Sequence, residues 1–172
     1  QEAAEADPWP ESVAPESSDA NSIRLIDLHL KARGGASQLA AVEAVRFSGM
    51  IEEGIMERDL EALVTRSGEM RLEWRRFHLG YDYLTVLATN GNQAWSRELL
   101  PEKRVPQKLA GQQLRHFRFL AGLPFLFLDH AAKGHLFAYK EKATYSGRPA
   151  YVLHGWLAGG MEVDIFIDAK TF

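Results

Sequence analysis

Histidine and acidic side chains carry the most obvious chemistry in this sequence, because imidazole and carboxylate groups bind zinc and transfer protons. Asp129 and His130 are adjacent, and His135 follows five residues later. This spacing matches no established motif such as H-E-x-x-H, so a structural or surface role is favoured and we predict no metal site. The histidines are His29, His78, His116, His130, His135 and His154.

Serine hydrolases place their serine on a strained Gly-x-Ser-x-Gly elbow or in a Ser-His-Asp arrangement, and the sequence shows neither. Ser67-Gly68 and Ser146-Gly147 are typical of turns. The carboxylates of Glu52-Glu53 and of Asp164 with Asp168 fit solvated strand faces. The sequence has no cysteine, and it has no glycine-rich phosphate-binding loop. We therefore predict no catalysis and no cofactor, and rank an uncharacterised hydrolase third among the functions considered.

Arginine is concentrated at Arg71, Arg75 and Arg76. A guanidinium group pairs bidentately with carboxylates and phosphates, so these side chains are candidates for contact with a lipid head group or an acidic partner. Glu69 and Glu73 lie in the same stretch, and ion pairing between strands is the simpler explanation. The net charge of -3, with both signs interspersed, argues against a nucleic-acid partner.

The elements that position these groups are mostly short strands. From Val45 to Phe172, alternating apolar and polar residues are interrupted repeatedly by Gly, Asn or Pro, a pattern typical of antiparallel sheet. Asn90-Gly91 is the strongest hairpin signal, and Trp95 follows it closely. The predicted strands span 44–53, 58–65, 69–79, 81–89, 93–98, 136–140, 142–145, 150–157 and 161–167.

Three helical segments accompany the strands. A helix is predicted over 23–32, with Asn21 or Ser22 as its N-cap and Gly34-Gly35 at its end. A short helix follows over 36–42, and the apolar spacing is helical again between 108 and 130. No apolar run is long enough to span a membrane.

The chain is predicted to form one domain over residues 22–172, preceded by an acidic, proline-containing segment, residues 1–21. That segment is predicted to be a flexible tether, and the alternative is a terminal segment with no specific function. The sequence starts at Gln1 without an initiator methionine, so we expect a mature or trimmed product whose targeting sequence lies upstream. A lipid-modified cysteine just before Gln1 is compatible with the same observation.

Several motifs in order resemble the bacterial outer-membrane lipoprotein-sorting (LolA/LolB-like) superfamily. They are Ala32-Arg33-Gly34-Gly35 with Leu39, Phe47-Ser48-Gly49, the segment 89–95, the segment 147–151 and the segment 167–172. The resemblance implies an α+β fold, in which a curled antiparallel sheet forms an open half-barrel and helices pack on its concave face. Relatives continue beyond the point that corresponds to Phe172, so part of the sheet is missing from this sequence or this member is shorter.

The resemblance also implies a non-catalytic protein of the periplasm or outer membrane that binds a lipid or the acyl chains of a lipoprotein. Such a ligand would lie in an apolar cavity between sheet and helices. The alternative is an interaction module that docks on an envelope protein and fills its core with its own side chains. The candidate cavity residues are Phe47, Leu60, Leu72, Trp74, Trp95, Phe117, Leu120, Phe125, Phe127 and Trp156.

Overall fold

The computed structural model describes residues 14–53 and 56–172. Its contacts divide the chain into two compact units. The central unit is Leu30–Asp129, and the terminal unit combines the described residues up to His29 with His130–Phe172. The expectation of one domain over 22–172 stays a prediction, and each unit is described by itself.

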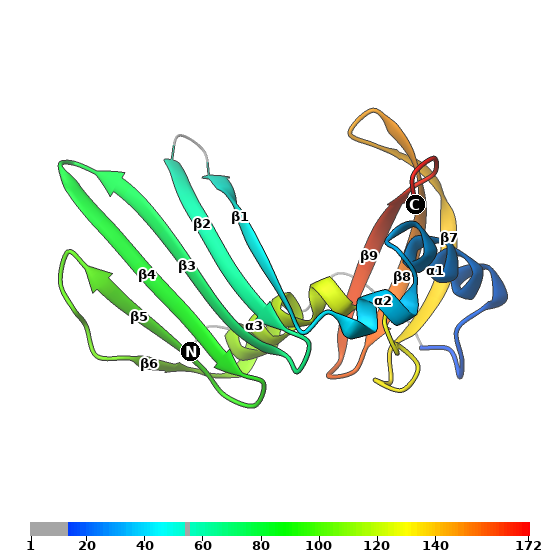
Figure 1. Cartoon of the computed structure of the whole chain (residues 1–172), viewed down its shortest axis with the longest axis horizontal. Helices are drawn as coiled ribbons and strands as arrows, with labels where there is room; N and C mark the ends of the chain where they lie inside the picture. Colours follow the sequence, from blue (N-terminus) through cyan, green and yellow to red (C-terminus); the bar gives the residue numbers. More distant parts are fainter. Residues whose placement is uncertain (1–13, 54–55) are drawn as a thin grey trace, which may run out of the picture. The chain divides into compact units, whose positions relative to one another are not determined.

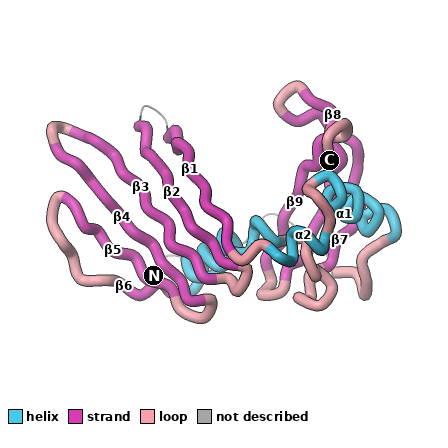
Figure 2. The backbone as a smooth tube through the Cα atoms, in the orientation of Figure 1, coloured by secondary structure: helices cyan, strands magenta, loops and turns pink. Residues whose placement is uncertain are grey.

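In the central unit, six strands form one antiparallel sheet in the order β1-β2-β3-β4-β5-β6 (Figures 1 and 2). The predicted α+β class, with an antiparallel sheet that is not closed, is confirmed. The strands are β1 (Ala44–Glu53), β2 (Met56–Thr65), β3 (Glu69–His78), β4 (Tyr81–Asn90), β5 (Ala94–Leu100) and β6 (Gln107–Leu109). The helical elements are the end of α1 (Ala20–Ala32), α2 (Ala36–Ala41), α3 (Gly111–Gly122) and the 3-10 turn η1 (Leu123–Phe125).

The strand register separates this sheet into two chemically different faces. In the register, Phe47 is the partner of Ala62, Ala62 of Leu72, and Leu72 of Leu87. These residues of β1 to β4 therefore share one face. We call this the helix face, because α3 packs on it. The opposite face is charged and is called the polar face; its residues include Arg46, Glu61, Arg71, Glu73 and Arg75.

Helix α3 covers one end of the helix face. Phe117 and Ala121 are 3% and 2% exposed, and they pack against a buried cluster on the sheet. This cluster consists of Ala62, Val64, Met70, Leu72 and Ala94. Because its members are almost fully buried, the space between α3 and the sheet is filled by side chains at this end.

In the terminal unit, three strands form a second antiparallel sheet in the order β7-β8-β9. Helix α1 contributes Leu25 and Ile26 to the buried side chains of the unit, together with Phe137 and Leu153 from the strands. Gly155 lies opposite Phe137, where an added Cβ would come within 2.8 Å of the phenylalanine ring. The strands are β7 (Leu136–Tyr145), β8 (Arg148–Leu157) and β9 (Met161–Asp168).

Asp19 joins the start of α1 to the free edge of β7. Its Oδ1 accepts hydrogen bonds from the backbone amides of Asn21 and Ser22 at 2.8 and 3.0 Å. Its Oδ2 accepts the amide of Tyr139 on β7 at 2.6 Å. The Ser22 hydroxyl also donates to the carbonyl of Phe137 at 2.7 Å. One carboxylate thus caps the helix and covers an edge strand.

The predicted N-cap was therefore wrong, because Asp19 rather than Asn21 or Ser22 receives the first amides and α1 begins at Ala20. The last residues of the predicted 1–21 tether are part of the folded terminal unit, while residues 1–13 lie outside the described residues.

Other boundaries also differ from the predictions. Segments 136–140 and 142–145 form one strand, because a bulge between Tyr139 and Glu141 interrupts the alternation without breaking the ladder. Strand β6 was missed, because three residues are too few to show a period. The helical period predicted over 108–130 is confirmed for α3, which ends at Gly122.

Replacing Asp19 by Ala should lower the free energy of unfolding of the terminal unit by about 1 kcal/mol at neutral pH. Burial alone would raise the pKa of Asp19, but the amides of Ser22, Tyr139 and Asn21 outweigh it and lower the pKa. The stabilisation is therefore present above the unfolded-state pKa and is lost as the pH falls through the lower folded-state value.

Urea unfolding across this pH range, with hydrogen exchange at the Tyr139 amide, measures the effect. Asp27→Ala is the matched control, because Asp27 is an exposed acid on the same helix. A destabilisation by Asp19→Ala that stays constant from neutral to acid pH would contradict the role given to the carboxylate charge.

Candidate functional site

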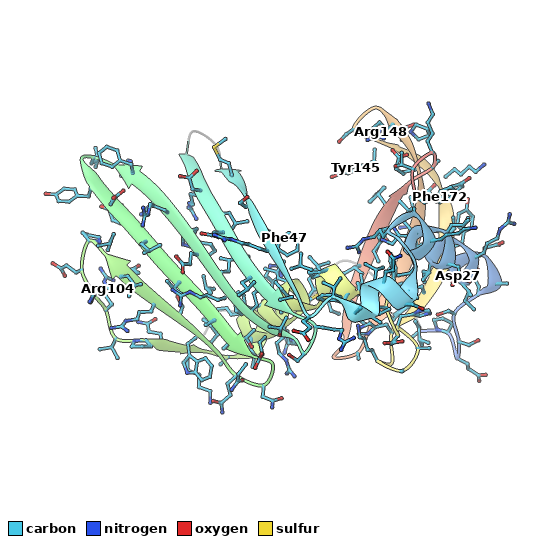
Figure 3. All side chains as sticks on the ribbon, viewed as in Figure 1. Asp27, Phe47, Arg104, Tyr145, Arg148 and Phe172 are labelled. Carbon is cyan, nitrogen blue, oxygen red and sulfur yellow. The ribbon has the colours of Figure 1, made fainter. Side chains whose placement is uncertain are left out.

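The helix face continues beyond α3 into a region that side chains only partly cover. Leu60 and Trp74 are paired across β2 and β3, are half-buried, and pack against the edge of the α3 cluster. Phe47 on β1 (Figure 3) is 41% exposed although it shares this face with the buried Ala62. Apolar surface therefore extends from the filled core into solvent on one face of the sheet.

Gly49 leaves space beside this apolar surface. It is paired with Leu60 in the register, and a Cβ built at Gly49 would meet no atom within 4 Å. With Phe47 two residues earlier on the same face, the β1 edge has an open position next to an exposed aromatic ring.

Farther from α3, the same face becomes cationic. Arg76 is paired with Tyr83, and its guanidinium carbon lies 4.6 Å from the centre of the tyrosine ring. Arg58 lies two residues before Leu60 and therefore on the same face. We call Arg58, Arg76 and Tyr83 the arginine row.

A cavity of about 170 Å³ opens at the arginine row. Among the described residues, Glu98 contributes a carboxylate to the lining and also pairs with Arg104 at 2.9 Å. The lining residues are Arg58, Trp74, Arg76, Tyr83, Thr85, Glu98 and Leu100. Aromatic rings and guanidinium groups are thus brought together directly beside the apolar surface.

The predicted arginine group is divided between the two faces of the sheet. Arg75 is paired with Asp59, and Arg71 pairs with Glu73 at 2.6 Å, all on the polar face. Arg76, one residue after Arg75, points to the helix face. A shallow depression of about 440 Å³ on the sheet is lined by Asp59, Glu61, Glu73 and Arg75 among others, and its charges are mixed.

The predicted cavity residues do not all lie at the helix face. Trp95 is paired with Ala88, which faces Arg71, so Trp95 lies on the polar face rather than with Trp74. Trp156 belongs to β8 in the terminal unit. Phe125 and Phe127 are buried just after α3, at 4% and 7% exposure. The helix face brings together the remaining candidates, Phe47, Leu60, Leu72, Trp74, Phe117 and Leu120.

Sequence reasoning missed Arg58 and Tyr83. For Arg58 the available signal was strand parity, because it lies two positions from Leu60, a predicted cavity residue on the same strand. Tyr83 had no such signal, because the strand predicted over 81–89 has apolar residues at both parities. In the terminal unit it also missed a cavity of about 370 Å³ between α1 and the sheet. This cavity is lined by Asn21, Arg24, Leu25, Leu28, Tyr139, Tyr151 and Phe172.

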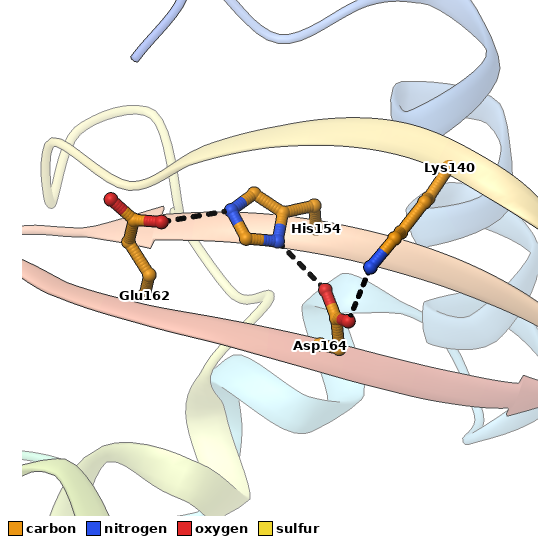
Figure 4. A network of polar contacts seen from close by, with 4 residues as sticks. All are labelled: Lys140, His154, Glu162 and Asp164. Atoms are coloured by element: carbon orange, nitrogen blue, oxygen red, sulfur yellow. Dashed lines mark hydrogen bonds and ion pairs between the residues drawn. The ribbon is translucent and has the colours of Figure 1, made fainter. Parts of the chain in front are cut away.

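The terminal unit also carries a network of polar side chains across β7, β8 and β9 (Figure 4). His154 places Nδ1 2.7 Å from Asp164 and Nε2 3.2 Å from Glu162. Lys140 donates to the other oxygen of Asp164 at 2.7 Å. Trp156 meets the His154 ring edge-on, with centroids 4.5 Å apart. Each ring nitrogen of His154 therefore faces a carboxylate of the protein itself.

Within residues 14–53 and 56–172, no three or more His, Asp or Glu side chains are grouped so that they could hold a metal ion. The helices in these ranges all lack the length or the apolar content that a membrane span requires. Comparison of the chain with models of protein families, with curated proteins and with solved structures finds no match.

Replacing Lys140 by Gln should raise the pKa of Asp164. The hydrogen bond from Lys140 is the largest cause that holds this pKa below its ordinary value, ahead of the opposing effect of burial and the contact with His154. A carboxyl-carbon NMR titration of Asp164 measures the change. Lys142→Gln is the matched control, because the Lys142 nitrogen lies over the Tyr151 ring instead. An unchanged Asp164 midpoint in Lys140→Gln would show that the ion pair does not form in solution.

Proposed function

We propose that the central unit is a non-catalytic binding module for an acyl chain, which lies on the helix face beyond α3. The observation that supports this best is the continuity of one apolar face. It is filled and buried under α3, and half-open at Leu60, Trp74 and Phe47. Each methylene removed from water contributes about 0.8 kcal/mol, so a chain laid along this face needs no directional bonds to bind.

The acyl chain would lie beside α3 rather than beneath it, because the cluster that Phe117 and Ala121 form with the sheet is already closed. A lipid or the acyl chain of a lipoprotein fits this geometry, and a place in the cell envelope, in the periplasm or at the outer membrane, goes with such a ligand. The resemblance to lipoprotein-sorting proteins supports the same assignment and is part of the proposal.

Replacing Phe47 by Gln should weaken the binding of dodecanoate roughly fivefold, because part of the apolar surface on the helix face becomes polar. Met50→Gln is the matched control. Met50 is 54% exposed on the same strand but on the opposite face, so neither change removes a buried side chain. Displacement of a neutral fluorophore by dodecanoate measures both variants.

Equal loss of binding in both variants, or in neither, would contradict the assignment to the helix face. If native mass spectrometry finds no bound lipid, and no long-chain compound displaces the fluorophore from the wild-type protein, acyl binding itself is wrong.

A second candidate function, docking on an envelope protein with a self-filled core, is favoured by the turn between β3 and β4. Leu79 and Gly80 both have positive φ, 50° and 83°, in a two-residue connection between His78 and Tyr81. A leucine in this conformation is strained, and its side chain is 80% exposed. Phe77 and Tyr81 beside it are 74% and 59% exposed. The local preference of the turn does not explain an apolar residue here.

Leu79→Asn should leave the stability of the central unit unchanged or raise it by up to about 1 kcal/mol, because Asn tolerates the left-handed conformation that strains Leu. Thermal unfolding measures this, and Leu79→Ala, which keeps the strain, serves as the control. A clear loss of stability in Leu79→Asn would show that Leu79 serves folding and would remove the support for docking at this turn.

A further inference from the structure

The charge distribution at the open end of the helix face identifies the ligand class more closely. We infer that the arginine row binds the anionic head group of a single-chain amphiphile, a carboxylate or phosphate whose alkyl chain lies along Leu60, Trp74 and Phe47. This inference rests on the proposed acyl binding and adds the chemistry of the end of the chain.

Along the helix face, the side chains change from apolar to cationic in the same order on two strands. From α3 outward, the β2 residues on the helix face are Val64, Ala62, Leu60 and Arg58. On β3 the corresponding order is Met70, Leu72, Trp74 and Arg76. Both strands therefore change from buried apolar to cationic at the same level. An amphiphile has the same order, with an apolar chain followed by a charged group.

The chemistry of the cavity lining suits the same kind of ligand. Among the described residues, Arg58 and Arg76 line the cavity together with Glu98 and with aromatic and apolar side chains. A guanidinium group has five N–H donors, so it can bind an anion while it keeps another contact within the protein. The lining therefore places cationic donors directly beside apolar surface, which complements an anion attached to an alkyl chain.

The arginine row is also held in a defined geometry. Tyr83 lies against the Arg76 guanidinium, which restricts the orientation of its donor groups. Planar guanidinium groups donate two parallel hydrogen bonds to a carboxylate or phosphate, and such charge-assisted bonds are stronger than neutral ones. The cavity of about 170 Å³ suits a head group, while the chain would extend from it across Trp74.

The test measures displacement of the neutral fluorophore N-phenylnaphthylamine from the full chain by dodecanoate, dodecyl phosphate and dodecanol. Wild-type protein should bind the two anions about tenfold more tightly than the alcohol, a difference typical of charge-assisted hydrogen bonds. Added salt should weaken binding of the anions and leave dodecanol unchanged.

The double variant Arg58→Gln with Arg76→Gln should lose this preference and keep its affinity for dodecanol. Arg75→Gln is the matched control, because Arg75 is the neighbour of Arg76 on the opposite face. Arg76→Lys provides a milder change, and it should keep part of the preference because it keeps the charge but not the planar fork. Circular dichroism verifies that each variant is folded.

The outcomes separate the two claims. Equal affinity of wild type for dodecanoate and dodecanol, or a preference that survives in the double variant, would overturn the head-group assignment and leave acyl binding intact. Failure of every long-chain compound to bind would overturn acyl binding and the head-group assignment with it. If acetate or inorganic phosphate displaced the fluorophore as well as the long-chain anions do, the site would take a free anion, and the amphiphile would be wrong.

Discussion

The antiparallel register of β1 to β4 is the constraint on which the central unit depends. Side chains alternate between faces with a period of two, so a slip of one residue would exchange the faces of a whole strand. In β2 such a slip would put Glu61 and Leu63 beneath α3 in place of Ala62 and Val64. The buried cluster therefore fixes the register. The same register aligns the half-open surface and the arginine row, which lie on residues of the same parity.

The sequence was a good guide to the strands, because their alternation is a local property. It was a poorer guide to the site, because the candidate residues were grouped by type rather than by parity. Arg75 and Arg76 are consecutive in a strand and cannot share a face, a fact that the sequence alone contains. The face of Trp95 could not be assigned from parity within one strand, because it depends on how β5 is paired with β4 after the turn at Asn90-Gly91.

What could not be predicted depends on contacts between distant parts of the chain. Asp19 caps α1 and also accepts an amide from Tyr139, 120 residues away. The sequence pattern favoured Asn21 or Ser22 because capping propensity is local, whereas the actual choice also satisfies the exposed edge of β7. The division of the described strands between two sheets is likewise a matter of long-range pairing, and nothing in the alternation of a single strand indicates its sheet.

The polar network around His154 and the arginine row differ in the groups that a ligand can contact. A histidine that acts as a general base needs a ring nitrogen directed at the substrate. Both nitrogens of His154 instead face Asp164 and Glu162, and the second oxygen of Asp164 is held by Lys140. These groups satisfy one another, which suits a cross-strand network that orders β7 to β9. The described lining of the cavity at the arginine row includes two guanidinium groups and adjoins apolar surface. The proposed binding of an anionic amphiphile depends on this combination, because the donors bind the charged group and the apolar face covers the chain.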